Sequence, residues 1–328
     1  MKRREFLGGL GCAAAWPITA RAQGGDRPRV VGVLMSPRED SLSQANVAAL
    51  RNAMQELGWS ENRNVRFEVR WSGGEIDRIR AFANELVALA PDVILAIGTP
   101  AIAVLKQVTR SVALVFLIVN DPVAQGFVSS VAHPGGNITG FSYLDFSVLG
   151  KEQQLLKQLV PGLKRAGFMF NPDTYSYYEV YLQTLQGQRQ DADFDLTALR
   201  VRSADEIKQA LEGLAKTPDA GLIVPPDPFT SANRKLIVDL AAQHRVPAMY
   251  GLRDFVTEGG MMSYAPNTTD IFRRSASYAD RILRGANPGE LPVQAPTRFE
   301  FVINQKTAQA LGVAIPANLL AVADEVIE

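Results

Sequence analysis

The stretch "VILAIGTP", residues 93–100, decides the fold class. Five apolar residues, Val93 to Ile97, come first, and three of them are β-branched. Gly98, Thr99 and Pro100 follow, and proline is tolerated in the first turn of a helix. An uninterrupted apolar run of this length is typical of a strand that is buried on both faces of a parallel sheet. The stretch therefore predicts a buried strand whose carboxyl end leads directly into a helix.

The same pattern recurs on both sides of this stretch. Short β-branched runs alternate with segments whose apolar residues recur at helical spacing, which indicates a βαβ succession. The predicted strands are Arg29 to Met35, Val65 to Trp71, Val93 to Ile97 and Val112 to Val119. The predicted helices carry Val47, Leu50, Met54 and Leu57, then Ile79, Phe82, Leu86 and Leu89, and a third follows Pro100.

A second round of the same alternation begins near Lys151. It predicts strands at Ala166 to Phe170, Leu196 to Val201, Gly221 to Val224 and Val246 to Met249. It predicts helices that end at Leu159 or begin near Tyr175, Ala204 and Ser231. Two rounds of strand–helix alternation indicate two similar lobes, each built on a doubly wound parallel sheet.

The remaining tail is too short to hold a third core. It predicts a helix from Asp270 to Leu283, a strand from Phe299 to Asn304 and short helices up to Glu328. We expect the tail to cross back and complete both lobes. The sequence therefore predicts an α/β protein with two doubly wound parallel-sheet lobes and a ligand cleft between them. Lobe 1 would comprise residues 29–140 plus about 266–297, and lobe 2 residues 141–265 plus about 298–328.

Composition and charge exclude several classes of function. The 328 residues include 34 basic and 34 acidic side chains, so the chain lacks the cationic excess of nucleic-acid-binding proteins. His133 and His244 are the only histidines, and neither belongs to a metal-ligand motif. We therefore expect no nucleic-acid partner and no metal site.

The N-terminal stretch from Lys2 to Gln23 has four readings: a membrane helix, a glycine-rich nucleotide loop, a lipid attachment site and an export signal. Its apolar part is shorter than a membrane span and is interrupted by Pro17, and no strand precedes its glycines. A basic start, an apolar run and a small-residue site favour a signal peptide, residues 1–22, that is cleaved after Ala22. Periplasmic localisation would follow.

The export route is less well determined. Arg3 and Arg4 resemble the twin-arginine (Tat) export motif, but Lys2 and Gly8 depart from its usual flanks. The general secretory route therefore stays open. Cleavage would also remove Cys12, the only cysteine, and with it any disulfide or thiolate site in the mature protein.

Candidate ligand-binding residues follow from matching the loops after equivalent strands of the two rounds. These loops recur at a nearly constant spacing of about 130 residues, as a duplicated lobe would give. In open α/β sheets, ligands bind outside the carboxyl ends of the strands. The candidates are Ser36, Gly98, Thr99, Asn120, Asp121, Tyr143, Asn171, Tyr175, Asp227, Tyr250 and Tyr264.

Each candidate has a structural alternative. The helix start at Gly98 and Thr99 could bind a ligand carboxylate, or Thr99 could only cap the helix. Asp121 could pair with a ligand ammonium group or stabilise its own turn, and Asp227 has the same two readings. Ser36 and Asn171 could donate from opposite walls or form turns. The four tyrosines could line the cleft and contact an aromatic or apolar ligand, although any one of them could equally serve packing.

Catalytic and cofactor motifs are missing at the expected places. Gly140 to Leu144 fails the last position of the G-x-S-x-G nucleophile elbow. No glycine-rich phosphate loop follows the first predicted strand, which ends at Ser36 and Pro37. We therefore expect a protein that is not an enzyme and binds no cofactor.

Several motifs together resemble one family. They are "RREFLGGLGCAAAWPITARAQ", "GTPA", "NDPVAQGFVSSVAHPGGNITGFS" and the closing "FEFVINQKTAQALGVAIPANLLAVADEVIE". The chain resembles, over nearly its full length, the substrate-binding proteins of ABC importers related to tryptophan and tyrosine binders. The resemblance implies the type I periplasmic binding fold, in which two lobes close on a small ligand and present it to a permease in the inner membrane. The family is broad in ligand.

The leading hypothesis is a monomeric periplasmic receptor of an ABC importer for an amino acid or small carboxylate, with aromatic ligands included. An exported cofactor-dependent α/β enzyme is a second hypothesis, which the missing glycine fingerprint disfavours. A ligand sensor for a membrane signalling protein is a third. Sequence alone does not separate sensing from transport, whereas the neighbouring genes would.

Overall fold

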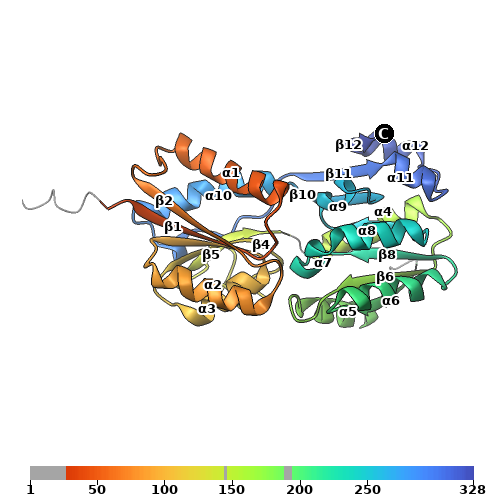
Figure 1. Ribbon diagram of the computed structural model, residues 1–328, viewed down its shortest axis with the longest axis horizontal. Helices are drawn as coiled ribbons and strands as arrows, with labels where there is room; N and C mark the ends of the chain where they lie inside the picture. The colour runs from red at the N-terminus through yellow and green to blue at the C-terminus, as the bar shows by residue number, and fades with distance from the viewer. Residues whose placement is uncertain (1–26, 144–145, 188–193) are drawn as a thin grey trace, which may run out of the picture.

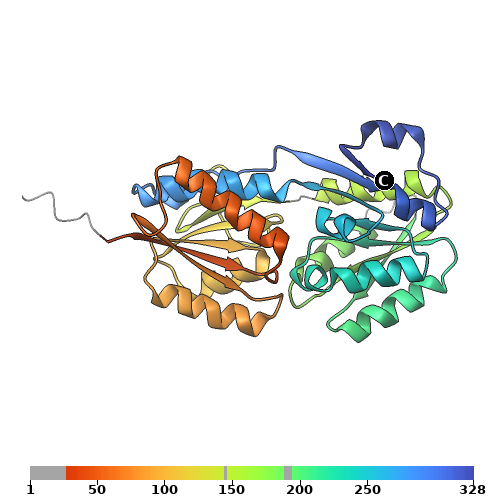
Figure 2. The same ribbon diagram turned by 45° about the horizontal axis from the view of Figure 1, so that its top comes forward.

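The computed structural model describes residues 27–143, 146–187 and 194–328. The predicted signal peptide, residues 1–22, and Cys12 lie outside the described residues. Two lobes of similar architecture lie side by side along the long axis of the molecule (Figures 1 and 2). Each lobe is a sheet with helices on both faces.

Lobe 1 contains a five-stranded sheet of order β2-β1-β3-β4-β5, in which all strands are parallel. Helices α2 and α3 pack on one face, and α1 and α10 pack together on the other (Figure 1). The elements are β1 (Arg29–Met35), α1 (Ser41–Glu56), β2 (Val65–Trp71), α2 (Ile76–Ala88), β3 (Val93–Ile97), α3 (Thr99–Val108), β4 (Ala113–Val119), β5 (Ile138–Ser142), α10 (Thr268–Leu283) and the 3-10 turn η1 (Pro288–Glu290).

The apolar runs of lobe 1 are explained by these two helical layers. Successive residues of a strand point to opposite faces, so a strand covered on both sides needs apolar residues throughout. Val31 and Val33 of β1 join the cluster that includes α1, whereas Leu34 joins the cluster beneath α2 and α3. All three side chains are completely buried.

Lobe 2 contains a seven-stranded sheet of order β12-β11-β10-β9-β8-β6-β7. Its strands are parallel to their neighbours except for β10 and β11, which are antiparallel. The elements are α4 (Phe146–Leu159), β6 (Arg165–Phe170), α5 (Tyr177–Gly187), β7 (Asp195–Arg200), α6 (Ala204–Ala215), β8 (Ala220–Val224), α7 (Pro228–Ala232), α8 (Arg234–Gln243), β9 (Ala248–Tyr250), α9 (Arg253–Thr257), β10 (Met262–Pro266), β11 (Phe299–Asn304), α11 (Gln305–Ala310), α12 (Ala317–Val322) and β12 (Glu325–Ile327).

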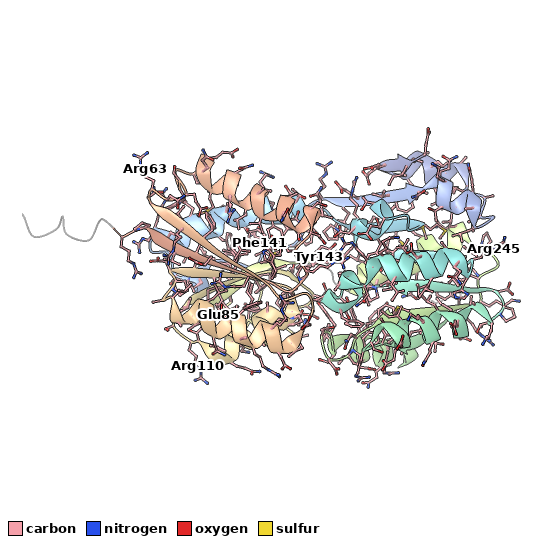
Figure 3. The ribbon with its side chains drawn as sticks, viewed as in Figure 1. Arg63, Glu85, Arg110, Phe141, Tyr143 and Arg245 are labelled. Atoms are coloured by element: carbon pink, nitrogen blue, oxygen red, sulfur yellow. The ribbon has the colours of Figure 1, made fainter. Side chains whose placement is uncertain are left out.

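The chain passes between the lobes three times: between β5 and α4, between β10 and α10, and between η1 and β11. Tyr143 lies at the first of these passages (Figure 3). Its hydroxyl donates towards the carbonyl oxygens of Gly251 and Pro266, at 3.1 and 3.4 Å, and Pro266 precedes the second passage. The side chain thus ties two of the three connections together.

The predicted two-lobed α/β class is confirmed, with corrections in detail. The second sheet is mixed rather than fully parallel, because β11 enters it from lobe 1 and runs opposite to β10. Sequence reasoning misses β5, α9 and β10, and it predicts only helices where β12 follows α12. Within the described residues, no helix combines the length and the apolarity that a membrane crossing requires.

Candidate ligand site between the lobes

A cavity lies between the two lobes and is lined by both of them. Its volume is about 70 Å³ in this structure. Small-molecule sites commonly have mostly apolar walls. The apolar lining here includes Met35, Ile97, Ile118 and Phe272 of lobe 1 and Tyr175 and Leu252 of lobe 2.

The carboxyl ends of the strands position most of this lining. Gly98 follows β3 directly, Pro226 and Asp227 follow β8, and Leu252 and Asp254 follow β9. Parallel strands deliver their following loops to one edge of a sheet, and the two sheets turn these edges towards each other (Figure 1). The predicted ligand cleft therefore has a physical counterpart in this cavity.

Ile118 reaches the cavity through a distorted strand. It has a φ of 58°, and the pairing of β4 with β5 shifts register between Leu117 and Val119. A β-branched residue rarely adopts positive φ, and such strain costs ~1–3 kcal/mol. A bulge re-aims a side chain, and here it coincides with the position at which β4 contributes an apolar wall.

One corner of the cavity region holds two hydroxyls without hydrogen-bond partners. Ser36 Oγ and Thr99 Oγ1 are both buried and make no hydrogen bond to the described residues. Ser36 lies beside Gly98, since a Cβ on Gly98 would be 3.3 Å from the Ser36 Oγ. Gly98, with a φ of 87°, is the N-cap of α3, and no side chain caps this helix end. Thr99 therefore does not serve as the predicted cap.

Asp227 lines the cavity and also holds two loops of lobe 2 together. Its carboxylate accepts hydrogen bonds from the backbone N–H groups of Asn171 and Phe229, both at 2.7 Å, and from the Thr174 hydroxyl at 2.8 Å. Burial raises the pKa of Asp227 to about 6, against the opposing effect of these hydrogen bonds. The alternative predicted for Asp227, a carboxylate that binds the backbone of its own turn, is present in the structure as the hydrogen bond from Phe229.

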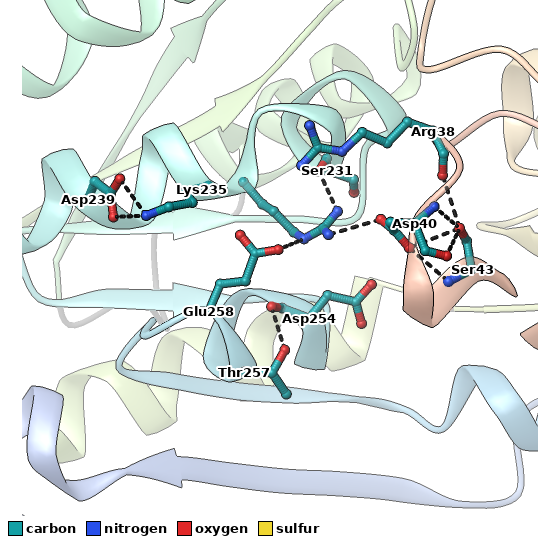
Figure 4. A network of polar contacts seen from close by, with 10 residues as sticks. Arg38, Asp40, Ser43, Ser231, Lys235, Asp239, Asp254, Thr257 and Glu258 are labelled. Atoms are coloured by element: carbon teal, nitrogen blue, oxygen red, sulfur yellow. Dashed lines mark hydrogen bonds and ion pairs between the residues drawn. The ribbon is translucent and has the colours of Figure 1, made fainter. Parts of the chain in front are cut away.

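A second, charged corner joins the lobes (Figure 4). Arg234 of α8 is paired with Asp40 of lobe 1 at 2.9 Å and with Glu258 of lobe 2 at 2.5 Å. Asp40 is the N-cap of α1 and forms a reciprocal capping box with Ser43. Burial raises the pKa of Asp40, but hydrogen bonds from Ser43 and the charge of Arg234 outweigh burial and leave this pKa below its usual value.

Other contacts across the cleft involve three tyrosines: Tyr175, which precedes α5, and Tyr177 and Tyr178 in its first turn. The Tyr175 hydroxyl accepts from the backbone N–H of Asn120 at 3.1 Å, and the Tyr178 hydroxyl accepts from its side-chain amide at 3.2 Å. Tyr177 donates to Asp121 Oδ2 at 2.7 Å. Burial raises the pKa of Tyr175 to about 12, so this phenol is neutral at physiological pH. The lobes are therefore in contact in this structure.

The structure brings only some of the predicted site residues to the cavity. Gly98, Tyr175 and Asp227 line it, and Ser36, Thr99 and Asn120 lie directly behind that lining. Asp121 lies outside the lining, where its carboxylate binds Tyr177 and the backbone N–H of Ala124. Four other predicted residues also lie outside the lining. Asn171 donates its backbone N–H to Asp227, and Tyr143 lies at the connection between the lobes. Tyr250 is stacked on Phe255, and Tyr264 is stacked on Phe299.

Sequence reasoning misses three of the four charged residues that line the cavity: Asp40, Arg234 and Asp254. Asp40 precedes a helix in the pattern of a capping box, which is a readable signal. Asp254 lies only four residues after the last residue of β9, within reach of a loop that the strand-end argument already selects. Arg234 has no local signal, since it is one basic residue at the start of an ordinary helix.

The family model described as "ABC transporter substrate binding protein" matches residues 30–327. The chain belongs to this family. Its members are binding proteins rather than enzymes, so the prediction of a non-enzymatic binding protein is confirmed and the cofactor-dependent enzyme is excluded. The described residues include no group of three or more His, Cys, Asp or Glu side chains that could hold a metal ion.

Individual relatives share the fold and part of the sequence. A tyrosine-binding protein from Clostridioides difficile (strain R20291) is 23% identical over 281 residues, which cover 86% of this chain and 80% of the relative. A conserved domain protein from Vibrio cholerae O1 biovar El Tor is 26% identical, with a TM-score of 0.84 and coverage of 92% and 100%.

Two further solved structures are similar to this chain, one with a bound ligand and one without. An ABC domain from Streptococcus pneumoniae in complex with L-Trp has 23% identity and a TM-score of 0.83, with coverage of 92% and 100%. The ligand-free, open structure of a substrate-binding protein with adhesive properties from Clostridium difficile has 21% identity and a TM-score of 0.66, with coverage of 92% and 99%. Both share the fold of this chain.

Proposed function

We propose that this substrate-binding protein is the receptor of an ABC importer and that its two lobes close on an amino acid, with aromatic amino acids as the first candidates. The lobes would be residues 29–140 with about 266–297, and 141–265 with about 298–328. Ligand binding would shift an open–closed equilibrium, and a single copy of the closed protein would dock on the permease.

The cavity between the lobes is the main support for this proposal. Its walls come from both lobes, so a ligand that fills it stabilises the closed arrangement by contacts that the open one lacks. The chain also superposes better on the L-Trp complex than on the open, ligand-free relative. The names of two relatives, a tyrosine binder and an L-Trp complex, support the choice of ligand class.

The carboxylate of the ligand would bind at the start of α3. The N-terminus of a helix favours anions because its first N–H groups are unpaired and its dipole is positive there. Ser36 and Thr99 hold two buried hydroxyls without partners in this corner. The apolar wall that includes Ile118 and Phe272 would then hold the side chain of the amino acid.

The test is a thermal-shift screen of the mature protein with amino acids, aromatic acids, sugars and short peptides. A ligand at 100 times its Kd adds ~2.7 kcal/mol to the free energy of unfolding, which corresponds to a rise in Tm of about 5 °C. We expect L-tryptophan, L-tyrosine or L-phenylalanine to give such a rise, and calorimetry to give one site per chain. A response to sugars alone would refute the ligand class.

We also propose that residues 1–22 direct the protein to the periplasm. The paired Arg3 and Arg4 precede an apolar run and a small-residue cleavage site at Ala22. Replacing both arginines by lysine should leave uncleaved precursor in the cytoplasm, measured by cell fractionation and by the mass of the product. Normal maturation of this variant would indicate the general secretory route instead.

A further inference from the structure

Acidic side chains outnumber basic ones among the residues that line the cavity. Asp40, Asp227 and Asp254 supply three carboxylates, whereas Arg234 is the one base among the lining residues that the structure describes. Glu258 lies behind them and shares Arg234 with Asp40. An enclosed space with excess negative charge favours an occupant that brings positive charge.

Three of these four lining groups already have partners. Asp227 accepts hydrogen bonds from the backbone and from a hydroxyl, and Asp40 accepts from Ser43 and pairs with Arg234. Arg234 is held between Asp40 and Glu258, and its side chain is only 10% exposed. None of the three is therefore free to be the primary anchor of a ligand.

Asp254 differs from the other three. Its side chain lines the cavity and is partly exposed, and its carboxylate receives no hydrogen bond from another described residue; its own backbone N–H is its only hydrogen-bonding neighbour. In Figure 4 the dashed line at Asp254 joins Thr257 to the backbone carbonyl, and the carboxylate has none. A carboxylate in the cavity wall that has no donor from the protein is available to a ligand that brings one.

The electrostatics of Asp254 agree with this geometry. Burial raises the pKa of Asp254 to about 6, Arg234 opposes the rise, and the charges of Asp40 and Glu258 add to it. Each of these effects except that of Arg234 makes the ionised carboxylate less stable. A ligand ammonium group would stabilise the ionised carboxylate against these unfavourable effects, because it has the opposite charge and carries three hydrogen-bond donors.

We propose that Asp254 binds the ammonium group of the ligand and restricts the cavity to ligands that carry such a group. This inference rests on the proposed function and assigns the role that sequence analysis gave to Asp121, whose carboxylate is occupied by Tyr177. A zwitterionic amino acid would thus extend from the hydroxyls of Ser36 and Thr99 to Asp254. Carboxylic acids that lack an amino group, and neutral sugars, leave Asp254 without a partner and are rejected.

Calorimetry of the wild-type protein tests whether the ligand needs an ammonium group, and it requires no substitution. The probes are L-tryptophan and L-tyrosine, each paired with the same acid lacking its amino group, indole-3-propionate and 3-(4-hydroxyphenyl)propionate. We expect the better amino acid to bind about 30- to 1,000-fold more tightly than its deaminated partner at pH 7.5. Equal affinities would overturn the role of Asp254, and a protein that binds none of the four would contradict the proposed ligand class itself.

Asp254→Asn localises the effect. It should weaken amino-acid binding by a similar factor and leave the affinity for the deaminated acid nearly unchanged, because only the ammonium contact is lost. Asp239→Asn, at an exposed carboxylate paired with Lys235 on the neighbouring α8, is the matched control and should bind like wild type. Wild-type affinity of Asp254→Asn for the amino acid would refute the proposal.

The pH dependence gives an independent readout. Between pH 7.5 and 5 the ligand-free cavity takes up a proton at Asp254, so wild-type affinity for the amino acid should fall about tenfold. Asp40, Asp227, Glu258 and Arg234 also face this space, and all of them remain in Asp254→Asn. If Asp254→Asn showed the same fall in affinity between pH 7.5 and 5, the titrating group would be one of those four, and the inference would be contradicted.

Discussion

Gly140→Ala is expected to lower the free energy of unfolding by more than about 4 kcal/mol or to prevent lobe 1 from folding. Gly140 lies in the middle of β5, directly opposite Phe116 of β4. A Cβ on Gly140 would lie 2.1 Å from the backbone oxygen of Phe116 and 2.7 Å from its backbone nitrogen. Backbone atoms in the interior of a sheet cannot retreat, so the strand pair has to separate.

The measurement is urea unfolding monitored by far-UV circular dichroism. Gly213→Ala, in helix α6, is the matched control, because nothing lies within 4 Å of the added Cβ. Alanine has the higher helix propensity, so this control should gain about 0.5–1 kcal/mol. Equal midpoints for Gly140→Ala and wild type would mean that β5 is not held against β4 as described.

Glu152→Gln is expected to stabilise the protein at pH 7.5, by at most about 4 kcal/mol, the limit set by the three pH units above the ordinary pKa of 4.5, and by much less near pH 4.5. Glu152 lies in α4 with no exposed surface, and neither carboxylate oxygen has a hydrogen-bond partner in the described part of the chain. Burial raises the pKa of Glu152 well above its ordinary value of 4.5. The folded protein therefore keeps a proton that the unfolded chain releases.

The sign follows from this difference in proton binding. Below about pH 4.5 both states hold the proton, and Glu152 does not disfavour folding. As the pH rises towards the raised pKa of the folded state, only the unfolded chain ionises, so the stability of the protein falls. Glutamine has nearly the same shape but cannot ionise, which removes this loss.

Urea unfolding of both proteins at pH 4.5, 6 and 7.5 measures this effect. The same substitution at exposed Glu212, on helix α6 of the same lobe, is the control and should change stability little at any of the three pH values. If the difference between Glu152→Gln and wild type were constant with pH, Glu152 would not be the buried neutral acid described above.

The elements of this fold differ in how well a local sequence pattern predicts them. Strands such as β1 and β3 are readable from sequence because both faces are buried, which forces an uninterrupted apolar run. The short strand β5 escapes prediction because its central residue is a glycine, which usually weakens a strand. Its glycine is required by contact with Phe116, a residue far away in the chain.

The candidate site shows the same division. Gly98 and Asp227 are predictable because they follow strands whose carboxyl ends must meet at one edge of a sheet. The choice between Asp121 and Asp254 is not local. Asp121 is occupied by a tyrosine of the other lobe, whereas Asp254 faces the cavity beside an arginine and an aspartate that belong to different lobes.

The sequence by itself determined the alternation of strands and helices, the two rounds that make two lobes, and the family to which the chain belongs. These features depend on the apolar pattern of neighbouring residues and on short motifs, and both are local in the sequence. Only the tertiary structure decided which carboxylates meet the cavity. The pairing of Arg234 with Asp40 depends on three passages of the chain between the lobes, and no local pattern encodes that placement.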